Sequence, residues 1–205
     1  LASTPERALA SGQELGLAAD RNYADFMAMA AAEAAREDGI DAVSIVTPNH
    51  VHFPAAKAFL EAGIPVICDK PLTGNGADAR ALADVASRTG TAFVLTHNYT
   101  GYPMVRQARE MIERGDLGEL RLVHVEYVQD WLSEDVESEG VKQAAWRTDP
   151  ARSGAGGAIG DIGSHAFNLV SFTTQKQVER LSAQLHSFVD GRRLDDNAHV
   201  MLDYS

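Results

Sequence analysis

The sequence predicts an α/β fold with a parallel sheet in the first half of the chain and an antiparallel or mixed sheet in the second half. Between residues 41 and 98, short apolar runs alternate with segments of helical period, as in a parallel sheet with right-handed crossovers. Beyond residue 100, strand-like segments follow one another without crossover helices, so we expect a separate α+β domain there. The boundary near residue 98 gives domains of residues 1–98 and 99–205.

Composition and helix-ending signals predict the elements of the first half. An alanine-rich stretch at residues 24–35 predicts a helix, because alanine has the highest helix propensity. Three short apolar runs are typical of fully buried strands: residues 42–46, 64–68 and 91–96. Two helices are expected between them, each followed by a glycine: residues 52–62 and 77–88.

The second half predicts two helices and three strands. Residues 103–114 predict a helix that ends at Gly115, and residues 161–172 predict one that follows a glycine-rich segment. Strands are expected at residues 120–128, 181–189 and 199–204. Between them, residues 130–140 form an irregular acidic stretch.

Charge and cysteine content restrict the class of protein. The formal net charge of -11 over 205 residues argues against nucleic-acid binding, which depends on neutralising phosphates. Cys68 is the single cysteine, so we expect no internal disulfide, a packing function for its side chain, and a cytoplasmic location. No apolar run approaches the roughly 18 residues of a membrane span, so we expect no membrane partner.

Three polar segments follow the three expected strands directly. They are residues 47–49 (TPN), 69–71 (DKP) and 97–99 (HNY). In open parallel sheets, ligands bind outside the carboxyl ends of the strands. The sequence therefore predicts a ligand site built from these segments.

Lys70 is the first candidate for chemistry in that site. It follows a strand and precedes Pro71, which holds its backbone extended. Facing a ligand, its ammonium group can donate a proton or orient an oxygen. The alternative is a surface lysine before a turn.

Asp161 and His165 are the second candidate. They lie four residues apart, so on a helix they share one face. A carboxylate beside an imidazole orients it and raises its basicity, which suits a general base. The glycines before them would let a ligand approach the backbone. The alternative is a helix-start aspartate and a packed histidine.

Ser3, Thr4 and Arg7 lie near the first residue of the chain. If a strand ends just before them, they would lie where the adenosine ribose of a dinucleotide is bound, and a hydroxyl with an arginine would suit a 2′-phosphate. The alternative is a helix cap at Ser3 or Thr4, with Pro5 at the first helical position.

Other polar residues are given structural interpretations. His50 and His52 lack a third ligand at zinc-like spacing, so we expect no metal site. Arg192 and Arg193 are expected to lie on the solvated surface.

Four segments resemble, in order and spacing, the glucose–fructose oxidoreductase and inositol dehydrogenase family, often written Gfo/Idh/MocA. They are residues 41–52 (DAVSIVTPNHVH), 69–71 (DKP), 97–120 (HNYTGYPMVRQAREMIERGDLGEL) and 146–165 (WRTDPARSGAGGAIGDIGSH). The resemblance implies a Rossmann-type dinucleotide-binding domain, an α+β domain with a mostly antiparallel open sheet, and NAD or NADP as cofactor. It also implies association through that sheet as a homodimer or tetramer.

The resemblance also implies functions for individual residues. Lys70 would contact substrate and nicotinamide, and Asp161 and His165 would belong to the catalytic trio, with His165 as the acid/base. The residues implied to line the cofactor are Thr47, Pro48, Asn49, His52, Asp69, Lys70, Asn98, Trp146 and Arg147.

The chain departs from the family pattern in two respects. Asp69 replaces the usual glutamate of an E-K-P motif, and the family's G-x-G-x-x-G is absent from the sequence. Those glycines let the backbone approach the pyrophosphate. We therefore expect an incomplete copy that lacks the first βα unit and the end of the second sheet.

These observations predict an NAD(P)-dependent oxidoreductase that acts on a hydroxyl-bearing carbon of a sugar or polyol. Ser3 and Arg7 favour NADP slightly. Lys70 and His165 are expected to meet around the reacting carbon. Two alternatives are glycoside cleavage with transiently used NAD and a non-catalytic sugar or dinucleotide sensor.

Overall fold

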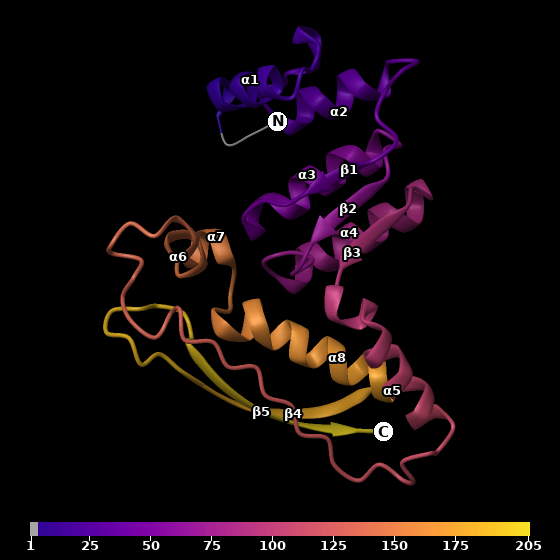
Figure 1. The fold of residues 1–205 in the computed structure, drawn as a ribbon, viewed down its shortest axis with the longest axis vertical. Helices are drawn as coiled ribbons and strands as arrows, with labels where there is room; N and C mark the ends of the chain where they lie inside the picture. The colour runs from indigo at the N-terminus through magenta and orange to yellow at the C-terminus, as the bar shows by residue number, and fades with distance from the viewer. Residues whose placement is uncertain (1–3) are drawn as a thin grey trace. The chain divides into compact units, whose positions relative to one another are not determined.

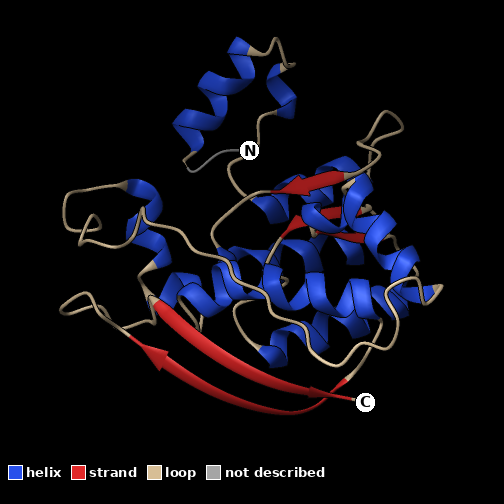
Figure 2. Cartoon of the chain, turned by 60° about the horizontal axis from the view of Figure 1, so that its bottom comes forward, coloured by secondary structure: helices blue, strands red, loops and turns tan. Residues whose placement is uncertain are grey.

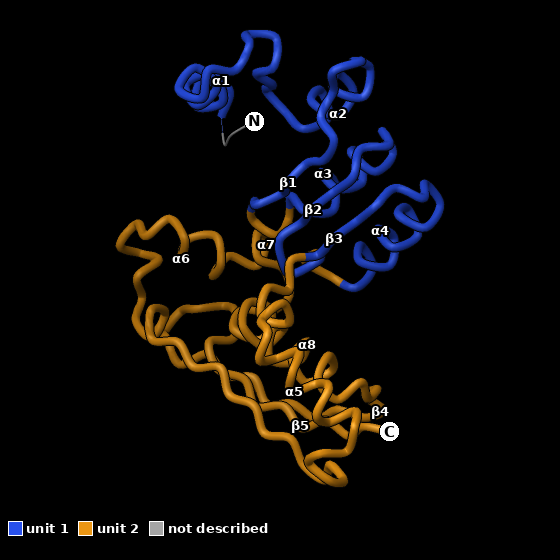
Figure 3. The backbone as a smooth tube through the Cα atoms, turned by 45° about the vertical axis from the view of Figure 1, so that its right-hand side comes forward, with its two compact units in different colours: residues 1–47, 51–72, 76–95 blue, residues 48–50, 73–75, 96–205 orange. Residues whose placement is uncertain are grey.

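The computed structural model describes residues 4–205, which form two compact units (Figure 3). The first contains the chain up to residue 47 together with residues 51–72 and 76–95. The second contains residues 48–50, 73–75 and 96–205. Each unit is described by itself below.

The first unit contains a three-stranded sheet in the order β1 (Val43–Ile45), β2 (Val66–Asp69) and β3 (Phe93–Thr96). β1 and β2 are parallel, with Val43 opposite Val66. The connections are helices α3 (Asn49–Glu61) and α4 (Gly76–Thr89) (Figure 1). The predicted parallel α/β architecture is confirmed.

The core of this unit lies between the helices and one face of the sheet. Phe59 and Leu60 of α3, Leu82 of α4 and Cys68 of β2 are all at most 1% exposed. The packing function predicted for Cys68 is confirmed, and burial raises the pKa of its thiol to about 12. The strands are not buried on both faces as predicted, since buried and exposed residues alternate along β1 and β2. Within residues 4–205, their apolar partners gather on one face only.

The chain enters this unit through α1 (Pro5–Glu14), a 3₁₀ turn (Ala19–Arg21) and α2 (Phe26–Ala34). The Thr4 hydroxyl accepts a hydrogen bond from the backbone N–H of Arg7 at 3.3 Å, and Pro5 occupies the first helical position. The predicted helix cap is therefore confirmed for Thr4. Ser3 lies outside the described residues.

The second unit begins with a 3₁₀ turn η2 (Asn98–Gly101) and α5 (Pro103–Glu113). Further along are the short helices α6 (Lys142–Arg147) and α7 (Pro150–Ser153), a π-helical turn η3 (Ile159–Gly163) and α8 (Ser164–Thr174). Strands β4 (Val178–His186) and β5 (Asn197–Tyr204) pair antiparallel. Helix α8 runs along this hairpin in both ribbon views (Figures 1 and 2).

The strand predicted at residues 120–128 is wrong for the described structure, which has neither helix nor strand at these positions. A strand needs a hydrogen-bonded neighbour. In the part of the second unit that is described, β4 and β5 pair with each other and no third strand joins them.

Among the helices of residues 4–205, none combines the length and apolar character that a bilayer span requires.

Candidate active site

In the first unit, the candidate lysine directly follows a sheet strand. β2 ends at Asp69, and Lys70 is the next residue, joined to Pro71 by a cis peptide bond. The Asp69 carboxylate accepts a hydrogen bond from the backbone N–H of Lys70 at 3.0 Å. The shorter acid in the DKP motif thus holds the backbone of the lysine that follows it.

His52 joins two of the polar segments predicted to bind a ligand. It is 1% exposed, and its Nδ1 lies 2.7 Å from the carbonyl oxygen of Pro71 while its Nε2 lies 2.9 Å from that of Thr47. Both ring nitrogens therefore face backbone oxygens. This side chain fixes the chain after β1 to the chain after β2, so any contribution to a ligand site is through the position of these segments.

We expect His52→Ala to lower the free energy of unfolding by about 2–4 kcal/mol, because it leaves a cavity and removes the ring N–H from the carbonyl oxygens that face it. His50→Ala is the matched control, since His50 is exposed on the same helix. Denaturant unfolding of both variants measures the difference. Equal stability of the two variants would show that the His52 contacts contribute nothing.

In the second unit, the glycine-rich segment before η3 is packed against the protein's own backbone. Asn49 is 6% exposed and donates from Nδ2 to the carbonyl oxygen of Ser153 at 2.7 Å. A Cβ atom on Gly154 would lie 2.5 Å from the carbonyl oxygen of Gly74. One on Gly157 would lie 2.0 Å from that of Asp195. We predicted that a ligand approaches these glycines, whereas in the structure the backbone of neighbouring loops packs closely against them.

Asp195 fixes the start of the helical run that carries both candidate catalytic residues. Its two carboxylate oxygens accept from the backbone N–H groups of Gly157 and Ile159, each at 2.7 Å. These donors belong to the first turn, where backbone N–H groups lack helical partners. Asp195 therefore acts as a cap supplied from a distant part of the chain, a function for which the local sequence gave no signal.

His165 lies in the first turn of α8 and is 9% exposed. Three aromatic rings surround it: Tyr99 with a centroid distance of 4.7 Å, Tyr127 at 6.1 Å and His97 at 6.2 Å. The imidazole is thus held in a partly apolar enclosure. The HNY segment after β3 supplies two of these neighbours.

Tyr99 and Tyr127 share a hydrogen bond between their hydroxyl oxygens at 2.7 Å. The bond to Tyr99, followed by burial, raises the pKa of Tyr127 to about 12, and the charge of Asp161 acts in the same direction. Tyr127 therefore keeps its hydroxyl proton at neutral pH beside His165. Tyr99 belongs to the predicted HNY segment, whereas Tyr127 stands in no motif that the sequence made visible.

Asp161 lies in the π turn that precedes α8 and accepts a hydrogen bond from Nε of Arg147 at 3.1 Å. The helix predicted at residues 161–172 therefore begins with a π turn rather than an α-helical turn, and the shared face of Asp161 and His165 stays a prediction. A π turn has i→i+5 bonding and often marks a functional site. The Arg147 contact joins this turn to α6.

The Arg147 side chain is held by several groups at once. Its Nη1 donates to Oε1 of Gln143 at 2.6 Å, and its guanidinium carbon lies 4.2 Å from the ring centroid of Trp146 and 5.7 Å from that of Trp131. These contacts fix the guanidinium plane that faces Asp161. The predicted Trp-Arg pair is thereby brought together with one of the predicted catalytic residues.

The remaining predicted residues are distributed over both units. Thr47, His52, Asp69 and Lys70 belong to the first unit, and the residues of the second unit are Pro48, Asn49, Asn98, Trp146, Arg147, Asp161 and His165. The convergence of Lys70 with His165 stays a prediction. Within residues 4–205, no group of three or more His, Cys, Asp or Glu side chains could hold a metal ion.

Two protein-family models match the chain. The model described as "Oxidoreductase family, NAD-binding Rossmann fold" matches residues 1–97. The model described as "GFO/IDH/MocA C-terminal domain" matches residues 105–205.

Individual relatives agree with these matches. The chain is 38% identical over 202 residues to an uncharacterized oxidoreductase, YfiI, of Bacillus subtilis, covering 97% of this chain and 51% of that protein. It is 32% identical over 155 residues to levoglucosan dehydrogenase of Pseudarthrobacter phenanthrenivorans, covering 76% of this chain and 38% of that enzyme.

The fold also matches a crystal structure of an inositol dehydrogenase homolog from Azotobacter vinelandii in complex with NAD+. The TM-score is 0.92 with 37% sequence identity, and the match covers 98% of this chain and 52% of that one. The chain thus spans about half the length of this protein and of YfiI.

Proposed function

Because the chain belongs to the Gfo/Idh/MocA family of oxidoreductases, we propose that the intact protein transfers a hydride between a nicotinamide cofactor and a hydroxyl-bearing carbon of a sugar or polyol. The observation that carries the proposal is the buried His165 in its aromatic enclosure, on the same helical run as Asp161. A general base that removes a hydroxyl proton needs such a shielded and oriented position.

Three side chains of the protein have separate functions in the reaction. His165 takes the proton of the reacting hydroxyl during oxidation and returns it during reduction. Asp161, oriented by Arg147, accepts a hydrogen bond from a substrate hydroxyl or from His165. Lys70 donates a hydrogen bond to the reacting oxygen and polarises it.

The nicotinamide ring would supply hydride acceptance and donation, while the protein supplies position and electrostatics. The described residues fit such a cofactor, because polar segments follow adjacent parallel strands and His52 holds two of them together. We assign contacts with it to Thr47, Pro48, Asn49, Asp69, Lys70, Asn98, Trp146 and Arg147. His52 would act through the segments it joins. Ser3, Thr4 and Arg7 are assigned to the adenosine side, and the hydroxyls with Arg7 favour NADP.

We further propose a cytoplasmic homo-oligomer, a dimer or tetramer. The β4–β5 hairpin supports this assembly, because Leu181, Leu185 and Val200 are 70%, 52% and 41% exposed on one face of it. Exposed apolar side chains that share one face of a hairpin are typical of an interaction face.

The test is a panel of polyols and sugars, including myo-inositol, levoglucosan, glucose and xylose, assayed with NAD and with NADP on the full-length protein. We expect net reduction of the cofactor with at least one substrate. Cleavage of a glycoside without net cofactor turnover would instead support hydrolysis. Binding without any turnover would support a sensor.

Lys70→Ala should lower kcat by at least about tenfold, because the donor that polarises the reacting oxygen is removed. Lys57→Ala is the control, since Lys57 pairs with Glu61 on the surface of α3. Steady-state kinetics of both variants with the best substrate measure the effect. Unchanged kcat in Lys70→Ala would remove this lysine from the mechanism.

A further inference from the structure

We propose that Trp131, positioned by the buried Arg192, is a specificity-determining residue that stacks against the ring of the sugar or polyol. The proposal rests on the proposed function, because Trp131 lines the same pocket as Asp161. It concerns recognition of the substrate rather than the chemical step.

The pocket lies within the second unit, and its lining suits a polyhydroxylated ring. Its walls include Gln129, Trp131, Arg147, Thr148, Asp161 and Leu194. The face of an indole suits the C–H face of a sugar, while amide and carboxylate groups suit the hydroxyls at its edge. The pocket therefore combines one aromatic wall with polar groups around it.

Two other acids in the lining are occupied by the protein. Asp195 accepts from Gly157 and Ile159, and Asp196 accepts from the backbone N–H groups of Phe188 and Val189. Both carboxylates thus already accept hydrogen bonds from backbone N–H groups of the protein. Among the acids of this lining, recognition of substrate hydroxyls therefore falls to Asp161.

Side-chain hydrogen bonds connect Trp131 to the enclosure of His165. The indole Nε1 donates to Oε1 of Gln129 at 3.3 Å, and Nε2 of Gln129 donates to the hydroxyl oxygen of Tyr127 at 3.4 Å. Tyr127 is bonded in turn to Tyr99, whose ring contacts that of His165. The aromatic wall and the proposed acid/base are thus parts of one network, as expected if they contact one substrate.

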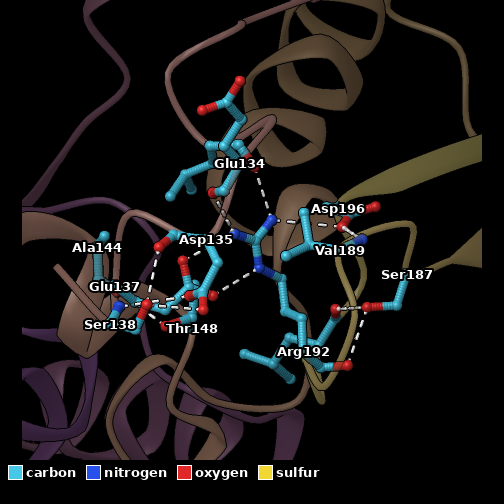
Figure 4. Close-up of polar contacts among 12 residues, drawn as sticks. Glu134, Asp135, Glu137, Ser138, Ala144, Thr148, Ser187, Val189, Arg192 and Asp196 are labelled. Carbon is cyan, nitrogen blue, oxygen red and sulfur yellow. Dashed lines mark hydrogen bonds and ion pairs between the residues drawn. The ribbon is translucent and has the colours of Figure 1, made fainter.

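Trp131 lies at the start of an irregular segment, so its position must come from outside that segment. Arg192 supplies this support (Figure 4). Its Nη1 donates to the carbonyl oxygen of Leu132 at 2.7 Å, and its Nε and Nη2 donate to the carboxylate of Glu137, each at 2.8 Å. Nη2 also reaches the carbonyl oxygen of Glu134 at 3.0 Å.

Arg192 is therefore an internal anchor. Its side chain is 2% exposed, and Asp196 lies 3.3 Å from Nη1 on the other side. The prediction that both arginines lie on the solvated surface is wrong for Arg192 and fits Arg193, whose side chain is 70% exposed. The bond to Leu132 fixes the backbone next to Trp131 and so fixes the indole.

The first test compares Trp131→Ala and Trp131→Phe in the full-length protein, with the best substrate of the panel. Loss of the aromatic face should raise KM for the sugar or polyol by about tenfold, with kcat changed less than about threefold and KM for the cofactor unchanged. Trp131→Phe keeps an aromatic face and should recover most of the affinity. Unchanged KM in Trp131→Ala would overturn the proposal.

The second test compares Arg192→Met with its neighbour Arg193→Met, which removes an exposed charge. Arg192→Met should raise the same KM by about fivefold to tenfold, while Arg193→Met leaves it unchanged. The effects of Arg192→Met and Trp131→Ala should not add in the double variant, because they act through one indole. Additive effects would overturn the positioning function of Arg192.

Glu137→Gln removes the charge that pairs with Arg192 and serves as a milder substitute if Arg192→Met fails to fold.

The kinetics of these variants distinguish a failure of the Trp131 proposal from a failure of the proposed function. If Lys70→Ala and His165→Ala lose turnover while Trp131→Ala keeps its KM, the specificity proposal fails alone. If no panel substrate is turned over, equilibrium binding of myo-inositol and levoglucosan by calorimetry replaces KM. Weaker binding in Trp131→Ala than in Trp131→Phe then supports the aromatic wall, and equal binding overturns it.

Discussion

Replacing His165 by alanine in the full-length protein should lower kcat by about 10²-fold or more, with a much smaller change in KM. The side chain lies in the enclosure formed by Tyr99, Tyr127 and His97, and we assign it the proton of the reacting hydroxyl. Loss of a positioned acid/base typically costs about 10²–10⁴-fold in rate. Steady-state kinetics over a range of pH measure both the fall in kcat and the loss of the histidine-dependent limb of the profile.

Two controls make this result specific to the proton transfer. His124→Ala removes a histidine whose side chain is 77% exposed, and it should leave kcat unchanged. Added imidazole should restore part of the activity of His165→Ala, since the substitution opens a space in a buried enclosure. A variant that keeps the wild-type kcat and pH profile would show that His165 is a packed core residue.

Replacing Asp195 by alanine should lower the free energy of unfolding by about 2–3 kcal/mol and lower kcat by about tenfold or more. The carboxylate holds the backbone N–H groups of Gly157 and Ile159 at the start of the run that carries Asp161 and His165. Losing a cap costs about 0.5–2 kcal/mol, and hydrogen bonds to a charged group are stronger than average. The fall in kcat follows because small displacements of catalytic groups slow the reaction strongly.

Asp190→Ala is the control for charge, because Asp190 is an exposed acid in the same connection between β4 and β5. Chemical denaturation and kinetics of both variants give the comparison. Asp195→Asn should also weaken the cap, since its Oδ1 accepts from one backbone N–H while its Nδ2 group faces the other donor. A stable Asp195→Ala variant with normal kcat would contradict the cap.

The local sequence predicted the first unit well, because its elements depend on short-range patterns. Apolar runs marked the strands, and Gly63 and Gly90 adopt the positive φ values of 77° and 65° that a glycine allows just beyond a helix. The strand at residues 120–128 failed for the opposite reason. Whether an alternating segment becomes a strand depends on a neighbour distant in the sequence.

The same contrast holds for the candidate site. Trp146, Arg147, Asp161 and His165 lie close together in the sequence, and the motif that contains them was visible. Trp131 and Asp195 are 30 residues or more from His165, and neither stands in a recognisable motif. Arg192 had the appearance of a surface residue because its partners lie 55 and 60 positions away at Glu137 and Leu132.

The sequence by itself determined the α/β architecture, the family and the residue types available for proton transfer, because these depend on periodicity and on short motifs. The tertiary structure decided which side chains surround His165, which groups hold the π turn at Asp161, and which arginine is buried. Those properties depend on contacts between segments distant along the chain, and the identity of a residue does not specify its partners.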